Sequence, residues 1–222
     1  MKALKITTPR GITAFPHLNT PDTKWRAEGE YKTGLVFDPN DETVSKMLQA
    51  LEAYYEEAYE DLCLQKGSLN KETRQIEPAE LNRASFPWKD QVDKDSKEPT
   101  GMVILTPKMK ALVKPKNGPE FTQKPRLFDC NNNTVTTVIR GGSTVRAAIE
   151  AVPYFNEKDQ EFGITLRLKA VQVHELSGYG NAESYGFEVE EGGYTAEDDA
   201  TAAEPETANA GAGDSDSLDG DF

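Results

Sequence analysis

The sequence has very few of the residues that build metal sites or disulfide frameworks. It contains two cysteines, Cys63 and Cys130, and two histidines, His17 and His174, spread over 222 residues. A zinc site needs Cys and His at close, regular spacing, and a disulfide framework needs several paired cysteines. We therefore expect neither kind of site, and no metal or other cofactor.

Long hydrophobic runs and catalytic motifs are missing as well. No apolar segment reaches the ~18 residues typical of a membrane-spanning helix. The first residues, "MKALKITTPRG", carry charges where a signal peptide needs an apolar run. The sequence has no Gly-rich phosphate loop ending in Lys and Ser or Thr, no HExxH and no GxSxG. These absences favour a protein of a reducing cytoplasm that is neither an enzyme nor bound to a membrane.

Basic residues are absent from the C-terminal end. Residues 188–222 contain 12 of the chain's 38 acidic residues and none of its 25 Lys and Arg. Because this segment is also poor in core-forming residues, we expect a folded domain over residues 1–187 and a disordered acidic tail over 188–222. Within the folded part, residues 97–146 carry nine basic and three acidic residues. An acidic tail together with a basic stretch predicts a surface that binds a polyanion.

The spacing of the apolar residues predicts a mostly β fold with one helix. Apolar residues recur at i, i+3, i+4 and i+7 from Asp41 to Gln65, which predicts one long amphipathic helix. Val171 and Val173 change the buried parity of the last strand, which indicates a bulge. Several short strands and one helix favour a small barrel with the helix packed on it. Strands are predicted over residues 24–38, 100–107, 126–129, 134–140, 143–152 and 162–176, with irregular stretches over 66–99 and 108–125.

Cations and flat side chains in such a barrel suggest binding of single-stranded nucleic acid. The backbone needs positive charge along its path, and bases stack on aromatic rings for about 1 to 3 kcal/mol each. We expect the groove face of the barrel to present cations that contact phosphate, the alternative being simple solvation. These cations are Arg26, Lys32, Lys108, Lys110, Arg146, Arg167 and Lys169.

The aromatic residues divide into core and stacking candidates. Trp25 and Tyr31 lie on the apolar parity of their predicted strand, which favours the core. Phe86 and Trp88 flank a proline in the irregular stretch, where they either stack on bases or anchor the loop. Of Tyr154 and Phe155, at the end of a strand, one is expected in the core and the other is free to stack.

Several motifs together resemble a known family. They are "GEYKTGLVF" followed by a helix with "EEAYE", then "IRGGSTVRAAIEAVPY", "GITLRLKAVQVHEL", "EVEEGGYTA" and a final "DGDF". In this order they resemble the single-stranded DNA-binding proteins of tailed phages, of the type encoded by T-odd short-tailed phages. The resemblance covers most of the chain.

The resemblance implies a five-stranded OB-fold barrel with one added helix. It also implies sequence-independent binding of single-stranded DNA in phage replication, recombination and strand annealing, in the host bacterial cytoplasm, with dimers in some relatives. Tyr154 corresponds to the family's stacking tyrosine; the aromatic two positions later is missing, because Asn156 stands there. The tail is implied to contact the phage DNA polymerase and primase-helicase and to compete with DNA, through Asp214, Asp216, Asp219, Asp221 and the terminal Phe222.

Two readings from other classes remain open at this point. One is a phage structural or assembly protein, in which the acidic tail masks a basic surface without any preference for single strands. The other is a metal-dependent nuclease, for which the folded part offers no evident carboxylate cluster. For the tail itself, the alternative to partner binding is simple solubility.

Overall fold

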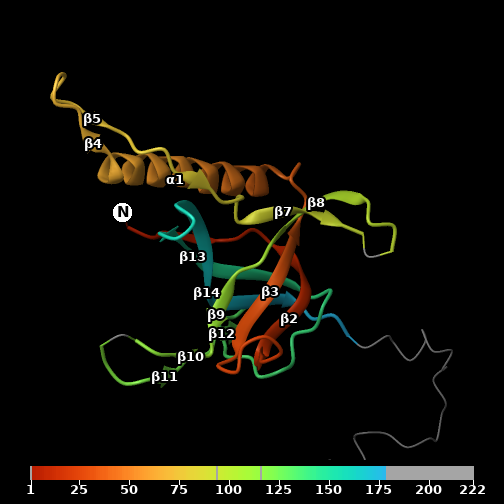
Figure 1. Cartoon of the computed structure of the whole chain (residues 1–222). Helices are drawn as coiled ribbons and strands as arrows, with labels where there is room; N and C mark the ends of the chain where they lie inside the picture. Colours follow the sequence, from red (N-terminus) through yellow and green to blue (C-terminus); the bar gives the residue numbers. More distant parts are fainter. Residues whose placement is uncertain (1, 94, 116, 179–222) are drawn as a thin grey trace, which may run out of the picture. The chain divides into compact units, whose positions relative to one another are not determined.

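The computed structural model describes residues 2–178 except 94 and 116 (Figure 1). The predicted boundary between residues 187 and 188, the acidic tail and its terminal Phe222 lie outside the described residues. Within the described part, strands predominate and α1 (Glu42–Lys66) is the one α-helix. This is the mostly β architecture with one long helix that the sequence predicts.

Five strands close into a barrel. Going round the ring, β2 pairs with β3, β3 with β9, β9 with β14, β14 with β13, and β13 with β2. All of these pairs are antiparallel except β9 and β14, which run parallel and are aligned at one residue pair, Lys108 with Arg167. The ring strands are β2 (Gly11–Asp22), β3 (Glu30–Phe37), β9 (Lys108–Lys110), β13 (Thr144–Asn156) and β14 (Glu161–Glu175).

Shorter strands extend the ring or form hairpins beside it. β1 (Leu4–Thr7) pairs with β13, while β6 (Asn82–Arg83) and β12 (Arg126–Phe128) pair with β14. β8 (Pro99–Leu105) pairs with β3 and with β7 (Trp88–Val92). Two small hairpins complete the set: β4 (Ser68–Leu69) with β5 (Ile76–Glu77), and β10 (Leu112–Val113) with β11 (Phe121–Thr122).

The helix α1 lies across the barrel and covers its core (Figure 1). Asp41 caps its N-terminus by accepting hydrogen bonds from the backbone N–H groups of Thr43 and Val44. The hydroxyl of Tyr55 donates to the Ala84 carbonyl (2.8 Å), and that of Tyr59 to the Leu81 carbonyl (2.8 Å). These two bonds fix the chain after β5 along one side of the helix.

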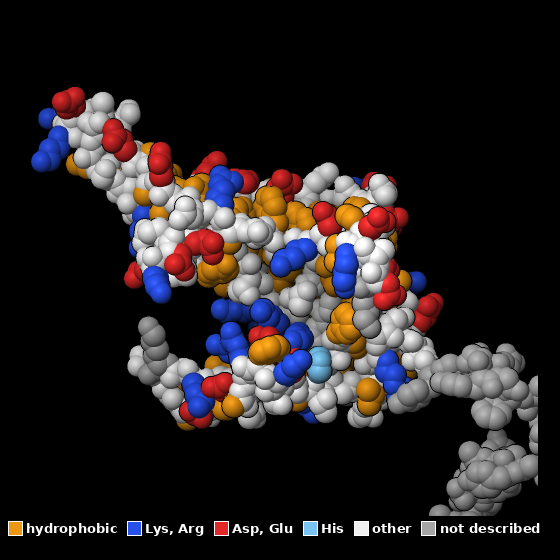
Figure 2. Space-filling model, turned by 45° about the vertical axis from the view of Figure 1, so that its right-hand side comes forward, with side chains coloured by type: hydrophobic (Ala, Val, Ile, Leu, Met, Phe, Trp, Pro, Cys, Tyr) orange, Lys and Arg blue, Asp and Glu red, His pale blue; other side chains and the backbone are white. Residues whose placement is uncertain are grey.

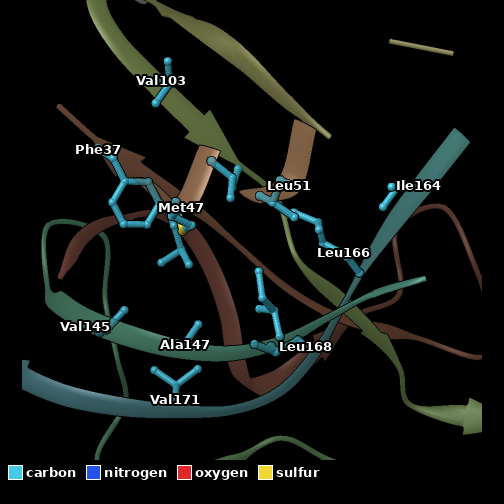
Figure 3. Close-up of a cluster of buried hydrophobic side chains, with 14 of the residues drawn as sticks. Phe37, Met47, Leu51, Val103, Val145, Ala147, Ile164, Leu166, Leu168 and Val171 are labelled. Atoms are coloured by element: carbon cyan, nitrogen blue, oxygen red, sulfur yellow. The ribbon is translucent and has the colours of Figure 1, made fainter. Parts of the chain in front are cut away.

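The core forms where the buried stripe of α1 meets the inner faces of β13 and β14. Figure 3 shows Met47 and Leu51 of α1 above Ala147, Leu168 and Val171 of the two strands. Leu51 and Ala147 are completely buried. Burying such side chains is the main force that holds the helix on the barrel.

The long-period patterns of the sequence are confirmed. The helix predicted over Asp41–Gln65 is α1, and the alternating residues of β13 and β14 are buried on the predicted parity. The predicted bulge is present as well: Ala148 aligns with Ala170 but Ile149 with Leu168, so Lys169 is the extra residue.

Three local predictions are wrong. The strand predicted from Lys24 begins at Glu30, because Gly29 adopts a φ of 73° and its N–H donates to the Arg26 carbonyl in a turn. The stretches 66–99 and 108–125 are not irregular throughout, since they contain β4 to β7 and β9 to β11. In the strand predicted over 134–140 only Thr134 makes a β-bridge, because the Asn19 side chain binds the backbone of Thr137 and Ile139 instead.

Candidate nucleic-acid interface

A groove of about 610 Å³ runs where β9 meets β14. We call it the basic groove. It is bounded by these two strands, by Arg26 in the turn before β3, by Glu30 at the start of β3, and by the β10–β11 hairpin. Figure 2 shows Lys and Arg side chains gathered in a hollow of this face, with most acidic side chains outside it.

Strand alternation places the cations in the groove. In β14, Arg167 and Lys169 are exposed, while Leu166 and Leu168, which alternate with them, are buried. In the short β9, Lys108 and Lys110 are exposed on either side of Met109. The barrel closure then aligns Lys108 with Arg167, which brings the cations of two distant segments together.

The charges lining the groove are mostly unneutralised. Its five cations are Arg26, Lys108, Lys110, Arg167 and Lys169, and its one acidic residue is Glu30. Lys169 forms a salt bridge with Glu150 (3.1 Å), whereas the other four cations make no salt bridge to any residue in the described part of the chain. Such a concentration of free positive charge is suited to a polyanion.

Two aromatic side chains accompany the cations in the groove. Tyr154, near the end of β13, is 42% exposed, and Phe121 of the β10–β11 hairpin is 50% exposed. Partial burial, and to a lesser extent the negative charge of Glu161, raise the pKa of Tyr154 above its ordinary value. Its ring therefore carries no charge at neutral pH and is available for stacking.

Five of the predicted site residues do not line the basic groove. Arg146 donates from Nε to the Thr8 carbonyl (3.0 Å) and lines a different cleft, together with Arg10. Lys32 forms a salt bridge with Asp22 (2.6 Å). Phe155 is half-buried beneath the ammonium group of Lys66, which lies 4.8 Å from the ring centroid.

Phe86 and Trp88 are the other two predicted site residues that do not line the basic groove. Their rings stack with centroids 4.7 Å apart and an interplanar angle of 11°, and Phe86 also packs edge-on against Tyr55 of α1 at 5.0 Å. Both pack against the hydrophobic core. This arrangement matches the loop-anchor alternative rather than free rings beside Tyr154.

The sequence patterns did not single out Phe121 and Glu30, and they placed Trp25 in the core. Trp25 is 81% exposed and lies next to the groove residue Arg26, with the Lys24 ammonium 5.3 Å from its ring centroid. Gly29 was the available signal, because a glycine inside an alternating pattern often marks a break. Phe121 lies in a proline-punctuated segment whose hairpin has no long-period pattern.

No cluster of three or more His, Cys, Asp or Glu that could hold a metal ion occurs among the described residues. The Sγ atom of Cys130 lies 3.4 Å from Nδ1 of His174. Burial, with the positive charges of Arg10 and Arg146 nearby, lowers the pKa of that imidazole.

No helix in the described part of the chain is long and apolar enough to cross a membrane.

The fold is shared with solved structures of phage proteins. One is the single-stranded DNA-binding protein gp2.5 of bacteriophage T7, with a TM-score of 0.62, 22% identity, and coverage of 88% of this chain and 100% of that one. Another is the single-stranded DNA-binding protein of bacteriophage Enc34 in complex with single-stranded DNA, with a TM-score of 0.53, 14% identity, and coverage of 80% and 89%. A C-terminal truncation of the Enc34 protein gives a TM-score of 0.52 and 15% identity, with coverage of 78% and 87%. No protein-family model matches the sequence, and neither does any curated protein.

These neighbours confirm at the level of fold the resemblance that the sequence motifs indicate. They are phage single-stranded DNA-binding proteins, and the match extends over most of this chain and nearly all of theirs. The expectation of an OB-fold-like barrel with one added helix is likewise confirmed.

Proposed function

We propose that the protein binds single-stranded DNA in the basic groove, independently of the base sequence of the DNA. The observation that carries this proposal is the meeting of five cations and two half-exposed aromatic rings in one groove at the seam of the barrel. The structural neighbours support it, since their own names describe the same binding activity.

The physical roles divide between the two kinds of residue. Lys108, Lys110 and Arg167 attract backbone phosphates, a contact that carries no sequence information. Tyr154 and Phe121 offer flat apolar faces on which any base can stack. In a duplex the bases are paired and stacked inside, so the aromatic contribution is available to single strands alone.

The wider biological role is also part of the proposal. The protein would act in phage DNA replication, recombination and strand annealing in the host bacterial cytoplasm, with residues 1–187 as the binding domain and 188–222 as a tail. Asp214, Asp216, Asp219 and Asp221 would steer the tail to basic surfaces of the polymerase and primase-helicase, where Phe222 supplies an apolar anchor. A homodimer, as some relatives form, belongs to the same proposal. The resemblance of the sequence motifs supports each of these points.

The decisive experiment compares single-stranded and double-stranded oligonucleotides by fluorescence titration at two salt concentrations. We expect preference for the single strand and an affinity that falls with salt, with a log-log slope of about −0.7 for each phosphate neutralised. Replacing Tyr154 with Ala should weaken single-strand binding by about 1 to 3 kcal/mol. A structural or assembly protein with a masked basic surface would bind both forms equally or not at all.

The matched control is Phe15→Ala. Phe15 is 81% exposed, as accessible as any ring in the described chain, but it does not line the basic groove. Its loss should leave binding unchanged. Equal losses from Tyr154→Ala and Phe15→Ala would show that the groove has no special role.

A further inference from the structure

A second, smaller cavity of about 170 Å³ adjoins the basic groove at Tyr154, whose side chain lines both. We call it the helix pocket. It lies between the C-terminal half of α1 and the strand ends of β13 and β14. Its lining includes Ala58, Asp61, Leu62 and Gln65 of α1, together with Tyr154 and Phe162.

Helical spacing explains why these α1 residues share one pocket. Positions 58, 61, 62 and 65 follow the i, i+3, i+4, i+7 pattern of one helix face. Ala58 and Phe162 are almost completely buried and form an apolar floor. Asp61 and Gln65 are exposed, so they place polar groups at the rim.

The polar groups at the rim are unengaged. Neither Asp61 nor Gln65 makes a side-chain hydrogen bond or ion pair with any other residue that the structure describes. The nearest described cation on the helix, Lys66, lies 4.8 Å from the ring centroid of Phe155, another lining residue of the helix pocket, and its charge is balanced by the Glu157 carboxylate (3.8 Å). The carboxylate of Asp61 and the amide of Gln65 are therefore available to a ligand.

Charge decides which part of a DNA strand can enter the pocket. A phosphate in the helix pocket would be repelled by the carboxylate of Asp61. In the basic groove, which shares Tyr154 with the helix pocket, five cations attract phosphates instead. An apolar floor with a stacking ring suits a nucleobase. A strand with its backbone on the cations would thus direct a base toward α1.

We propose that the helix pocket binds one base of the strand and prefers guanine over thymine. The Watson–Crick edge of guanine carries two adjacent N–H donors, which match the two oxygens of a carboxylate, and a carbonyl oxygen, which matches an amide N–H. Asp61 would accept from the donors and Gln65 would donate to the carbonyl. Thymine offers only one N–H donor, which lies between two carbonyl oxygens. These carbonyl oxygens are acceptors, and the carboxylate of Asp61 would repel them. The inference rests on the proposed single-stranded DNA binding and adds a modest base preference to it.

Fluorescence anisotropy with the full-length protein tests the preference. The probes are a short oligo-dT, the same oligonucleotide with one central dG, and a third in which inosine, which lacks the 2-amino group, replaces that dG. A single guanine suffices because the protein can choose the register that places it in the pocket. We expect about three- to tenfold tighter binding of the dG probe than of oligo-dT, with inosine between them.

Two variants locate the effect. Asp61→Ala should bring the ratio of the affinities for the dG and dT probes close to one, chiefly by weakening binding of the dG probe. Glu57→Ala is the matched control, because Glu57 is an exposed carboxylate one turn earlier on α1 that does not line the helix pocket, and it should keep the full ratio.

Three results would overturn the inference. The wild-type protein could bind the dG and dT probes equally, or Asp61→Ala could retain the full preference; in both cases the proposed function would stand without the base pocket. Failure to bind any of the three probes would instead remove the proposed function, and the inference with it.

Discussion

The ring of Tyr154 lies directly over the backbone of Gly163, its cross-strand partner in β14. A Cβ atom added at Gly163 would come within 2.5 Å of the tyrosine hydroxyl oxygen and 2.6 Å of Cζ. No other residue type leaves room for the ring there. The position of the candidate stacking residue is therefore set by a glycine on the neighbouring strand.

Replacing Gly163 with Ala should displace the Tyr154 ring without unfolding the protein, because the clash is with the far end of a flexible side chain. We expect single-stranded DNA binding to weaken toward the level of Tyr154→Ala, a loss of up to about 1 to 3 kcal/mol. Titration with oligo-dT measures the loss. In a Tyr154→Ala background the same replacement should have little further effect.

Gly178→Ala serves as the control for this prediction, because a Cβ at Gly178 meets no atom within 4 Å. Additive losses in the double variant, or unchanged binding in Gly163→Ala, would show that the ring position over Gly163 is irrelevant to DNA.

The cations at the barrel seam should each contribute to salt dependence. Lys108→Ala and Arg167→Ala are each expected to reduce the slope of log affinity against log salt by about 0.7, if each contacts one phosphate. Lys71→Ala, at an exposed position in the β4–β5 turn, should leave the slope unchanged. If all three variants kept the same slope of log affinity against log salt, the DNA phosphates would not contact Lys108 and Arg167.

The N-terminal cap of α1 should make helix stability depend on pH. Hydrogen bonds from the Thr43 hydroxyl, and from the backbone N–H groups of Val44 and Thr43, lower the pKa of Asp41. A lowered folded-state pKa means that the stabilisation is present above the ordinary Asp pKa and is lost as the pH falls through the folded-state value. Thermal unfolding followed by circular dichroism should show this loss as a lower Tm in acid.

Other carboxylates titrate in the same range, so variants must isolate Asp41. Asp41→Asn keeps a good capping side chain but removes the titration, and its Tm should fall less than that of the parent on acidification. Asp41→Ala should be less stable than the parent at neutral pH and should approach it in acid. If the difference between parent and Asp41→Ala did not change with pH, the cap would not titrate as described.

Removing residues 188–222 should tighten DNA binding severalfold at low salt, because 12 acidic residues that can compete for the basic groove are lost. Removing Phe222 alone should leave DNA affinity nearly unchanged and weaken binding to a polymerase or primase-helicase partner. Titrations with oligo-dT and with the partner separate the two effects. Unchanged DNA affinity after truncation would contradict competition by the tail.

Segments with a sustained periodic pattern could be read correctly from the sequence, whereas most short strands, and the long β2, which contains Pro16 and Pro21, could not. α1 and the long strands β13 and β14 repeat their pattern often enough to reveal the buried face, and Val171 even revealed the bulge. β9 is three residues long, too short for any period, yet it closes the barrel. Its role depends on pairing with distant strands, which local patterns do not encode.

The lining of the basic groove, the candidate site, was predictable to a similar extent. Arg167 and Lys169 follow from alternation in a long strand, and Tyr154 from the resemblance of its motif. Phe86 and Trp88 gave the same local signal as a stacking pair, but contact with Tyr55 of α1 decides their packing, and that contact joins separate parts of the chain. Trp25 was misplaced because one turn at Gly29 ends the alternation on which its burial was inferred.

The seam of the barrel is also the floor of the basic groove. At this seam one aligned pair joins β9 to β14, and both of its residues, Lys108 and Arg167, are cations. Two like charges thus lie on adjacent strands, where they repel each other, at the join of the ring with the fewest aligned residues. A strand of DNA laid across them would neutralise that repulsion and bind only the closed ring. Under the proposed function, ligand binding and barrel closure would be linked, and bound DNA would stabilise the closed barrel.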